Sequence, residues 1–381
     1  MTRCLLSETH FSVNTLGEVN PCCRYTPSHD VRTFLNKRSV ADVFSDSYLV
    51  AIRERLKNGI KDEGCYHCWD EEDHGVKSLR QIHNSGIDET GISGNPINDI
   101  KSLEIAFSNH CNMKCRHCKT ASSSRWKTDD EILGRWVPDK ILQEPDVSSF
   151  KLDQLKNLKH IKILGGEPLL SKAHTQFMKV LDENNLIQNL SFDIITNGSV
   201  FPNDIVLNGW KKAKAVTIVV SVDDIESYFN YFRSDGDFDI LTENMRKFEN
   251  LDFENITLYI HTVVNVLNVY RISQVFKYFC SHFEKWNMYF DKIHSPDYLR
   301  IEQWDKHSVQ SEYDEINKLI TESKSQSELL TLTRLLKMLD SIKNEAADFR
   351  ELFDINFKLD NSRNTSLLDI HPIFKNYKRN D

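Results

Sequence analysis

The 381-residue chain contains no long hydrophobic run. Because a helix needs about 18 to 20 successive apolar residues to span a bilayer, we expect no membrane-spanning segment. The first residues also lack the apolar stretch of a secretory signal, which predicts a cytoplasmic protein in a reducing compartment. No internal repeat or low-complexity tract occurs.

Charge of one sign is in only small excess. The chain has 56 acidic residues against 48 lysines and arginines, for a net charge of −8. This balance argues against tight, nonspecific attachment to intact nucleic acid or to an anionic membrane. Hydrophobic residues make up 40% of the chain and charged residues 27%, as in an ordinary globular protein. The length allows one large domain or two unequal ones.

Six short apolar segments are predicted to be β-strands. They are near-continuous runs of Ile, Val, Leu and Phe, as expected of parallel strands that are covered on at least one face. The segments are 102–108, 160–166, 191–197, 215–223, 255–265 and 285–293. Helical patterns lie between them, which gives repeated βα units and predicts an α/β fold. In such folds the chemistry lies at the carboxyl ends of the strands.

Nine cysteines are present, and eight of them are clustered. Clustered thiols in a reducing compartment indicate metal chemistry rather than disulfides. Cys111, Cys115 and Cys118 form a C-x3-C-x2-C loop directly after the first of the six strands. A structural zinc ion requires four protein ligands, and no fourth cysteine follows nearby. Three thiolates can instead hold a 4Fe–4S cluster and leave its fourth iron open.

The cysteine loop, together with the segment GGEP (165–168) after the second strand, resembles the radical S-adenosylmethionine (SAM) superfamily over residues 100–295. The resemblance implies a partial (β/α)6 TIM-like barrel. It also implies a 4Fe–4S cluster whose open iron binds SAM and cleaves it reductively to a 5′-deoxyadenosyl radical, which abstracts hydrogen from a substrate. Cys111, Cys115 and Cys118 would be the cluster ligands.

The same resemblance implies a set of SAM-binding residues. They are Phe107, His117, Gly165, Gly166, Glu167, Asn197, Ser221, Asp223 and Arg233. Simpler roles stay open at this point. GGEP alone reads as a turn before a Pro-initiated helix. The polar residues at strand ends also cap turns in many proteins, and Arg233 could form a surface salt bridge.

The first seventy residues hold a second group of thiols. Cys4, Cys22, Cys65 and Cys68 could complete one four-ligand site, with Cys23 as the alternative to Cys22. The segment is similar to the auxiliary-cluster modules called SPASM and, in shortened form, twitch, although those modules usually follow the radical SAM core. The similarity implies an auxiliary 4Fe–4S cluster; zinc and no metal are the alternatives. Late segments also resemble uncharacterised twitch-type proteins, several of them from viruses of bacteria.

These observations predict four parts of the chain: a Cys-rich module (1–83), a linker (84–99), a radical SAM core (100–295) and a helical C-terminal extension (296–381). Cys280 is expected to be a buried core thiol.

The resemblance to SPASM-type enzymes ranks a peptide or protein first as the substrate, before a carbohydrate, nucleotide or other small metabolite. It implies an electron donor such as flavodoxin or ferredoxin. The rivals are a noncatalytic Fe–S or zinc-stabilised binding protein, and a SAM-dependent methyltransferase. The latter would need a glycine-rich loop where this chain has cysteines.

Overall fold

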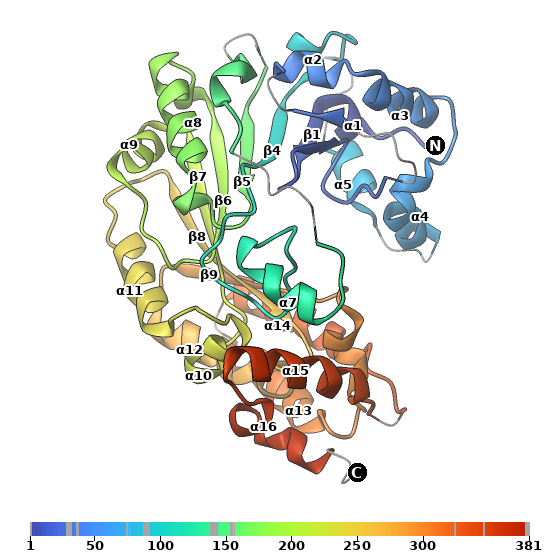
Figure 1. Ribbon diagram of the computed structural model, residues 1–381, viewed down its shortest axis with the longest axis vertical. Coiled ribbons are helices and arrows are strands. Elements are labelled where there is room, and N and C mark those ends of the chain that lie inside the picture. The colour runs from blue at the N-terminus through green and yellow to red at the C-terminus, as the bar shows by residue number, and fades with distance from the viewer. Residues whose placement is uncertain are drawn as a thin grey trace.

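Figure 1 shows the protein as a computed structural model with one curved sheet at its centre. The structure describes residues 2–27, 33–35, 38–73, 75, 77–86, 92–137, 144–152, 155, 157–323, 325–345 and 347–377. Within these ranges, no helix is both long and apolar enough to cross a membrane.

Within the described residues, the sheet has nine strands in the order β3-β2-β1-β4-β5-β6-β7-β8-β9. Six of them form a parallel series: β4 (Ser102–Ala106), β5 (His160–Leu164), β6 (Ser191–Thr196), β7 (Ala215–Ser221), β8 (Ile256–Val264) and β9 (Trp286–Lys292). These are the six predicted strands, each within two residues of its expected start. The predicted α/β fold, a partial (β/α)6 barrel, is confirmed.

Alternating burial explains why these segments pair in this register. Ile161 and Ile163 of β5 lie opposite Phe192 and Ile194 of β6, and all four side chains are at most 1% exposed. They point to the face that the helices cover, while the residues between them point to the concave face. A shift of one residue would turn the whole apolar set toward the open side, which fixes the register.

Helices of the βα units cover the outer face of the sheet (Figure 1). They are α8 (Lys172–Glu183), α9 (Asp204–Lys212), α11 (Phe238–Glu249) and α12 (Ile272–His282), while the short α10 (Glu226–Phe232) contacts α11. In α8, the Ser171 side chain caps the first turn by accepting from the His174 N–H. Ala173, Phe177 and Leu181 follow at helical spacing and are buried against the sheet.

The Cys-rich module is continuous with the central sheet. Strand β1 (His10–Val13) pairs in parallel with β4, and β2 (Glu18–Asn20) pairs antiparallel with β1 and with β3 (Thr33–Phe34). The module's helices are α1 (Leu5–Thr9), α2 (Val40–Phe44), α3 (Ser47–Lys57), α4 (Tyr66–Asp73) and α5 (Leu79–Asn84). In the predicted linker, α6 (Pro96–Asp99) forms, and residues 87–91 lie outside the described residues.

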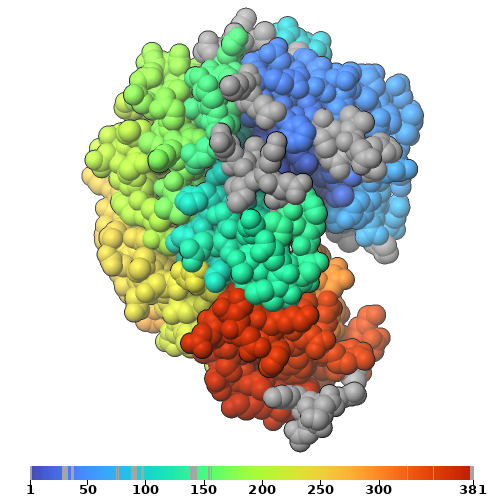
Figure 2. Space-filling view, viewed as in Figure 1, coloured from blue at the N-terminus to red at the C-terminus, as the bar shows by residue number. Residues whose placement is uncertain are grey.

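The C-terminal extension is helical, as predicted, with α13 (Gln310–Glu322), α14 (Gln326–Leu339), α15 (Arg350–Arg363) and α16 (Leu367–Ile370). Helix α14 contacts β9, and α15 contacts α7 (Lys127–Ile132). Figure 2 shows the C-terminal residues, in red, lying directly against the blue-green segment that follows β4. The extension therefore reaches the neighbourhood of the cysteine loop.

The prediction for Cys280 is wrong. This thiol is exposed. The buried face of α12 is formed by Ile272, Val275, Phe276 and Phe279. Cys280 follows them in the last turn of α12, which ends at His282, and its side chain is exposed there.

Candidate functional site

The cysteine loop leaves the carboxyl end of β4 and is held by main-chain hydrogen bonds. The Lys114 N–H donates to the Ser234 carbonyl at 2.8 Å, and the Arg116 N–H donates to the Phe232 carbonyl at 2.8 Å. Cys111 and Cys115 are buried, Cys118 is half-buried, and all three are free thiols. Their side chains are therefore available as ligands in a loop whose backbone is already fixed.

The GGEP segment packs onto the start of this loop. The Gly166 N–H donates to the Ser108 carbonyl at 2.9 Å, and the Glu167 N–H donates to the His110 carbonyl at 2.7 Å. A Cβ on Gly166 would lie 2.2 Å from the His110 oxygen, and one on Gly165, where φ is +140°, would lie 2.8 Å from the Ser108 oxygen. Both glycines are thus required by the close approach of two loops.

Glu167 ties the GGEP segment to the end of β6. Its side chain is 1% exposed. One carboxylate oxygen accepts from the Thr196 hydroxyl at 2.7 Å and from the Leu169 N–H at 3.0 Å, and the other accepts from the Asn197 N–H at 2.7 Å. Burial raises the pKa of this carboxyl to about 7, against the opposing effect of these hydrogen bonds.

Asn197 connects the end of β6 to the cysteine loop. Its amide nitrogen donates to the Asn112 side-chain oxygen at 3.0 Å and lies 3.8 Å from the Cys111 sulfur. Asn197 therefore does more than cap the strand end, because its side chain reaches the thiol loop directly. Ser221 lies at the end of β7, opposite His261 of β8.

Arg233 and Asp223 form a buried ion pair beside the thiols. Their side chains are 6% and 1% exposed, and the guanidinium lies 2.7 Å from the Asp223 carboxylate. Another guanidinium nitrogen lies 3.6 Å from the Cys115 sulfur. The surface salt bridge considered for Arg233 is thus excluded. The buried positive charge can compensate for thiolate charge where burial alone disfavours it, since burial raises the pKa of Cys111 to about 11.

His117 and Phe107 have packing partners. The His117 ring stacks on Phe232 with centroids 5.2 Å apart. Burial lowers the pKa of His117 to about 4, so the ring is neutral near pH 7. Phe107 packs against His174 and Phe177 of α8, with ring centroids 5.9 and 5.4 Å away. A contact of either ring with SAM stays a prediction.

The four N-terminal cysteines converge although they come from distant parts of the module. Cys4, Cys22, Cys65 and Cys68 line one small cavity together with Leu6, Arg24, Tyr25, Leu79 and Arg80. Cys23 is exposed and does not line this cavity. The geometry therefore favours Cys22 over its neighbour as a ligand. In the described part of the chain, no group of three or more His, Cys, Asp or Glu side chains is placed to hold a metal ion.

The contacts between the outer side of the cysteine loop and helix α15 were not predicted from the sequence. Arg116, between the second and third cysteines, is fully buried, and it bonds to Asp360 of α15. A charged residue inside a loop of proposed ligands could have suggested a buried counter-charge. Nothing in the sequence pattern indicates that the counter-charge comes from residue 360.

Residues 105–278 match the model of the Radical SAM superfamily. The matched segment includes the cysteine loop, GGEP and the ends of β6 and β7. The match supports an enzyme.

Curated relatives include GTP 3′,8-cyclases from strains of Helicobacter pylori. The HPAG1 protein is 27% identical over 128 residues, which cover 34% of this chain and 36% of the relative. The J99 protein has the same identity and coverage. The chain thus spans about a third of the length of these relatives.

Solved structures that match part of the chain include anSMEcpe with bound AdoMet and a Kp18Cys peptide. It is 19% identical, covers 58% of this chain and 59% of its own, and has a TM-score of 0.41. Streptococcus suis SuiB bound to precursor peptide SuiA is 14% identical, covers 93% and 74% of the two chains, and also has a TM-score of 0.41.

Proposed function

We propose that this chain is a radical SAM enzyme that modifies a peptide or protein. One observation supports a radical SAM enzyme: residues that follow the carboxyl ends of four strands lie in contact with one another. Cys111 contacts Asn197, Cys115 contacts Arg233, and the GGEP segment bonds to the Ser108 and His110 carbonyls. Parallel strands bring their carboxyl ends to one rim, so residues from β4 to β7 form one site.

The donor set at this rim, three thiols and no fourth cysteine nearby, is the one expected for an iron–sulfur cluster with one open coordination position. Cys111, Cys115 and Cys118 would hold the cluster, and they supply three free thiols beside a buried guanidinium. When bound, the cluster and SAM supply a 5′-deoxyadenosyl radical that abstracts hydrogen from the substrate.

The protein's own groups would position SAM and exclude water. Gly165, Gly166 and Glu167 would meet its amino group, because the glycines keep the backbone accessible and the carboxylate complements a positive charge. The ribose and the carboxylate of SAM would be bound by the polar side chains of Asn197, Ser221, Asp223 and Arg233. Arg233 is the one of these with a full charge for an anionic group.

An auxiliary 4Fe–4S cluster in the N-terminal module is part of the proposal. Cys4, Cys22, Cys65 and Cys68 share one cavity, which Arg24 and Arg80 also line. Strand β1 joins this module directly to β4. A second cluster here would be next to the barrel, where it could accept an electron from a substrate radical.

The peptide substrate rests on the similarity to SPASM and twitch modules. A nucleotide is the second candidate, because the curated relatives are named GTP 3′,8-cyclases. A library of peptides and a panel of nucleoside triphosphates, each incubated with SAM under reducing anaerobic conditions, would separate the two by mass spectrometry of products.

The test of the enzyme class is formation of 5′-deoxyadenosine from SAM and dithionite by anaerobically reconstituted protein. Cys115→Ala should abolish it, since one cluster ligand is lost. Cys280→Ala is the matched control, because this exposed thiol lies on the outer helix α12. Equal turnover by the wild type and Cys115→Ala would exclude the proposed site.

A further inference from the structure

Helix α15 and the outer side of the cysteine loop are joined by a set of contacts, the clamp, that centres on Arg116 and Arg363. Arg116, located between Cys115 and Cys118, is 0% exposed and points into helix α15. Its guanidinium donates to the Asp360 carboxylate at 2.6 Å and to the Thr365 hydroxyl at 3.1 Å, and it also donates to the Asn356 side-chain oxygen. The contact joins residues 244 positions apart.

Arg116 is also held from the other side. Its third guanidinium nitrogen donates to the Tyr231 carbonyl at 3.1 Å, and the guanidinium carbon lies 3.6 Å from the Tyr231 ring centroid. The Arg116 carbonyl accepts from the Tyr298 hydroxyl at 3.0 Å. Every guanidinium nitrogen thus has a partner, as a buried charge requires.

A second arginine extends the clamp from the helix back to the loop. Arg363 of α15 donates to the Lys114 carbonyl at 2.9 Å and to the Asp129 carboxylate at 3.1 Å. Its guanidinium lies 4.8 Å from the Trp126 ring centroid, and the Trp126 indole N–H donates to the Cys115 carbonyl at 2.8 Å. Arg116 of the loop and Arg363 of the helix therefore together hold the Lys114–Arg116 segment in place.

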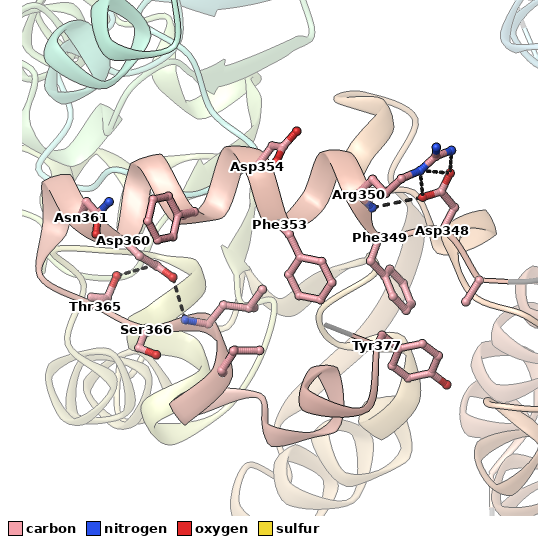
Figure 3. Close-up of a pocket in the computed structure, with 14 residues that line it drawn as sticks. Asp348, Phe349, Arg350, Phe353, Asp354, Asp360, Asn361, Thr365, Ser366 and Tyr377 are labelled. Carbon is pink, nitrogen blue, oxygen red and sulfur yellow. Dashed lines mark hydrogen bonds and ion pairs between the residues drawn. The ribbon is translucent and has the colours of Figure 1, made fainter. Parts of the chain in front are cut away.

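The geometry of α15 suits this task. Asn356, Asp360 and Arg363 are separated by four and three residues, so they lie on one face of the helix. The helix ends at Asn364, where φ is +52°, and the turn brings back the Thr365 hydroxyl and the Leu367 N–H to bond Asp360 at 2.7 Å each. Figure 3 shows both bonds from Asp360 at the end of the helix. The carboxylate that receives Arg116 is thereby held in place.

We infer that Arg116 and Arg363 are positioning residues, through which helix α15 holds the cysteine loop in its ligand-ready shape before any cluster binds. The expected effect on cluster binding rests on the proposed function, whereas the first experiment does not depend on it. Preorganisation lowers the conformational cost of bringing three thiols together. A loop lacking its clamp should keep its cysteines yet hold a cluster less uniformly.

The first experiment measures hydrogen exchange in the metal-free protein. In Arg116→Lys, which keeps the charge but loses the planar fork, exchange of the amides in 111–118 should be about tenfold faster or more. Arg350→Lys is the matched control: it lies on the same helix, and its ion pair with Asp348 is exposed. Equal exchange in the two variants would overturn the inference.

The second experiment uses reconstituted protein. The electron paramagnetic resonance spectrum of the reduced cluster should broaden in Arg116→Lys, while thermal unfolding stays cooperative; an unchanged spectrum would count against the inference. If Arg116→Lys fails to fold, Arg363→Lys takes its place in both measurements. A wild type that binds no iron would refute the proposed function, whereas the exchange result on metal-free protein would still decide on the clamp.

Discussion

Gly166 provides a direct test of the contact between the two motif loops. Alanine there would place its Cβ 2.2 Å from the His110 oxygen, 2.5 Å from the His110 carbonyl carbon and 2.6 Å from the Asn109 carbonyl carbon. All three atoms belong to the backbone, so no side chain can rotate away. The loops must separate by about 1 Å to reach an ordinary van der Waals distance.

The cost follows from what this separation breaks. Overpacking in a closely packed site costs about 1–3 kcal/mol. Two hydrogen bonds between the loops, from the Gly166 and Glu167 N–H groups, contribute about 1 kcal/mol each. We therefore expect Gly166→Ala to lower the free energy of unfolding by about 3–5 kcal/mol, and to reduce iron content because the cysteine loop moves.

The assay is urea unfolding of the metal-free protein, with iron content measured after reconstitution. Gly86→Ala is the matched control, since the nearest atoms to its added Cβ are 3.9 Å away. A Gly166→Ala variant with the stability and iron content of Gly86→Ala would refute the packing argument.

Three further predictions concern charge and ligand choice. Glu167 has a pKa raised by burial to about 7, so its contribution favours folding below about pH 4.5 and is lost as the pH rises through about 7. Glu167→Gln should remove about 3 kcal/mol of this pH dependence, seen by comparing urea unfolding at both ends of that range, and the same pH dependence in the two proteins would contradict it. Asp223→Asn leaves the Arg233 charge buried without its partner and should cost about 3 kcal/mol in metal-free protein; a cost below that of a surface substitution would show that the pair is not needed for folding. Cys22→Ala should lower the iron content of the reconstituted protein by about four per chain, one auxiliary cluster, while Cys23→Ala should not; equal iron loss in both would reject the assignment from the cavity.

Much of the fold could be predicted from the sequence because its causes are local. A run such as residues 215–223 is β-branched and apolar, so it is stable as a covered strand wherever it pairs. The Ser171 cap and the spacing of Ala173, Phe177 and Leu181 also determine α8 within one segment of chain. The C-x3-C-x2-C spacing is local too, and the radical SAM match covers the same segment.

Other features depend on contacts that no local pattern contains. The choice between Cys22 and Cys23 depends on which of two adjacent side chains turns toward Cys4, Cys65 and Cys68. Cys280 shows the same limit: it lies in an amphipathic helix beside apolar residues, and only the packing around the last turn of α12 leaves its thiol exposed.

The support of the cysteine loop is the clearest product of tertiary structure. The sequence by itself determined that three thiols stand close together after a strand. Only the folded chain brought Asp360 and Arg363 to Arg116 and Lys114, across about two thirds of the chain length. The physical reason is that a buried guanidinium must find its counter-charge in space, and spacing along the chain does not specify where that counter-charge comes from.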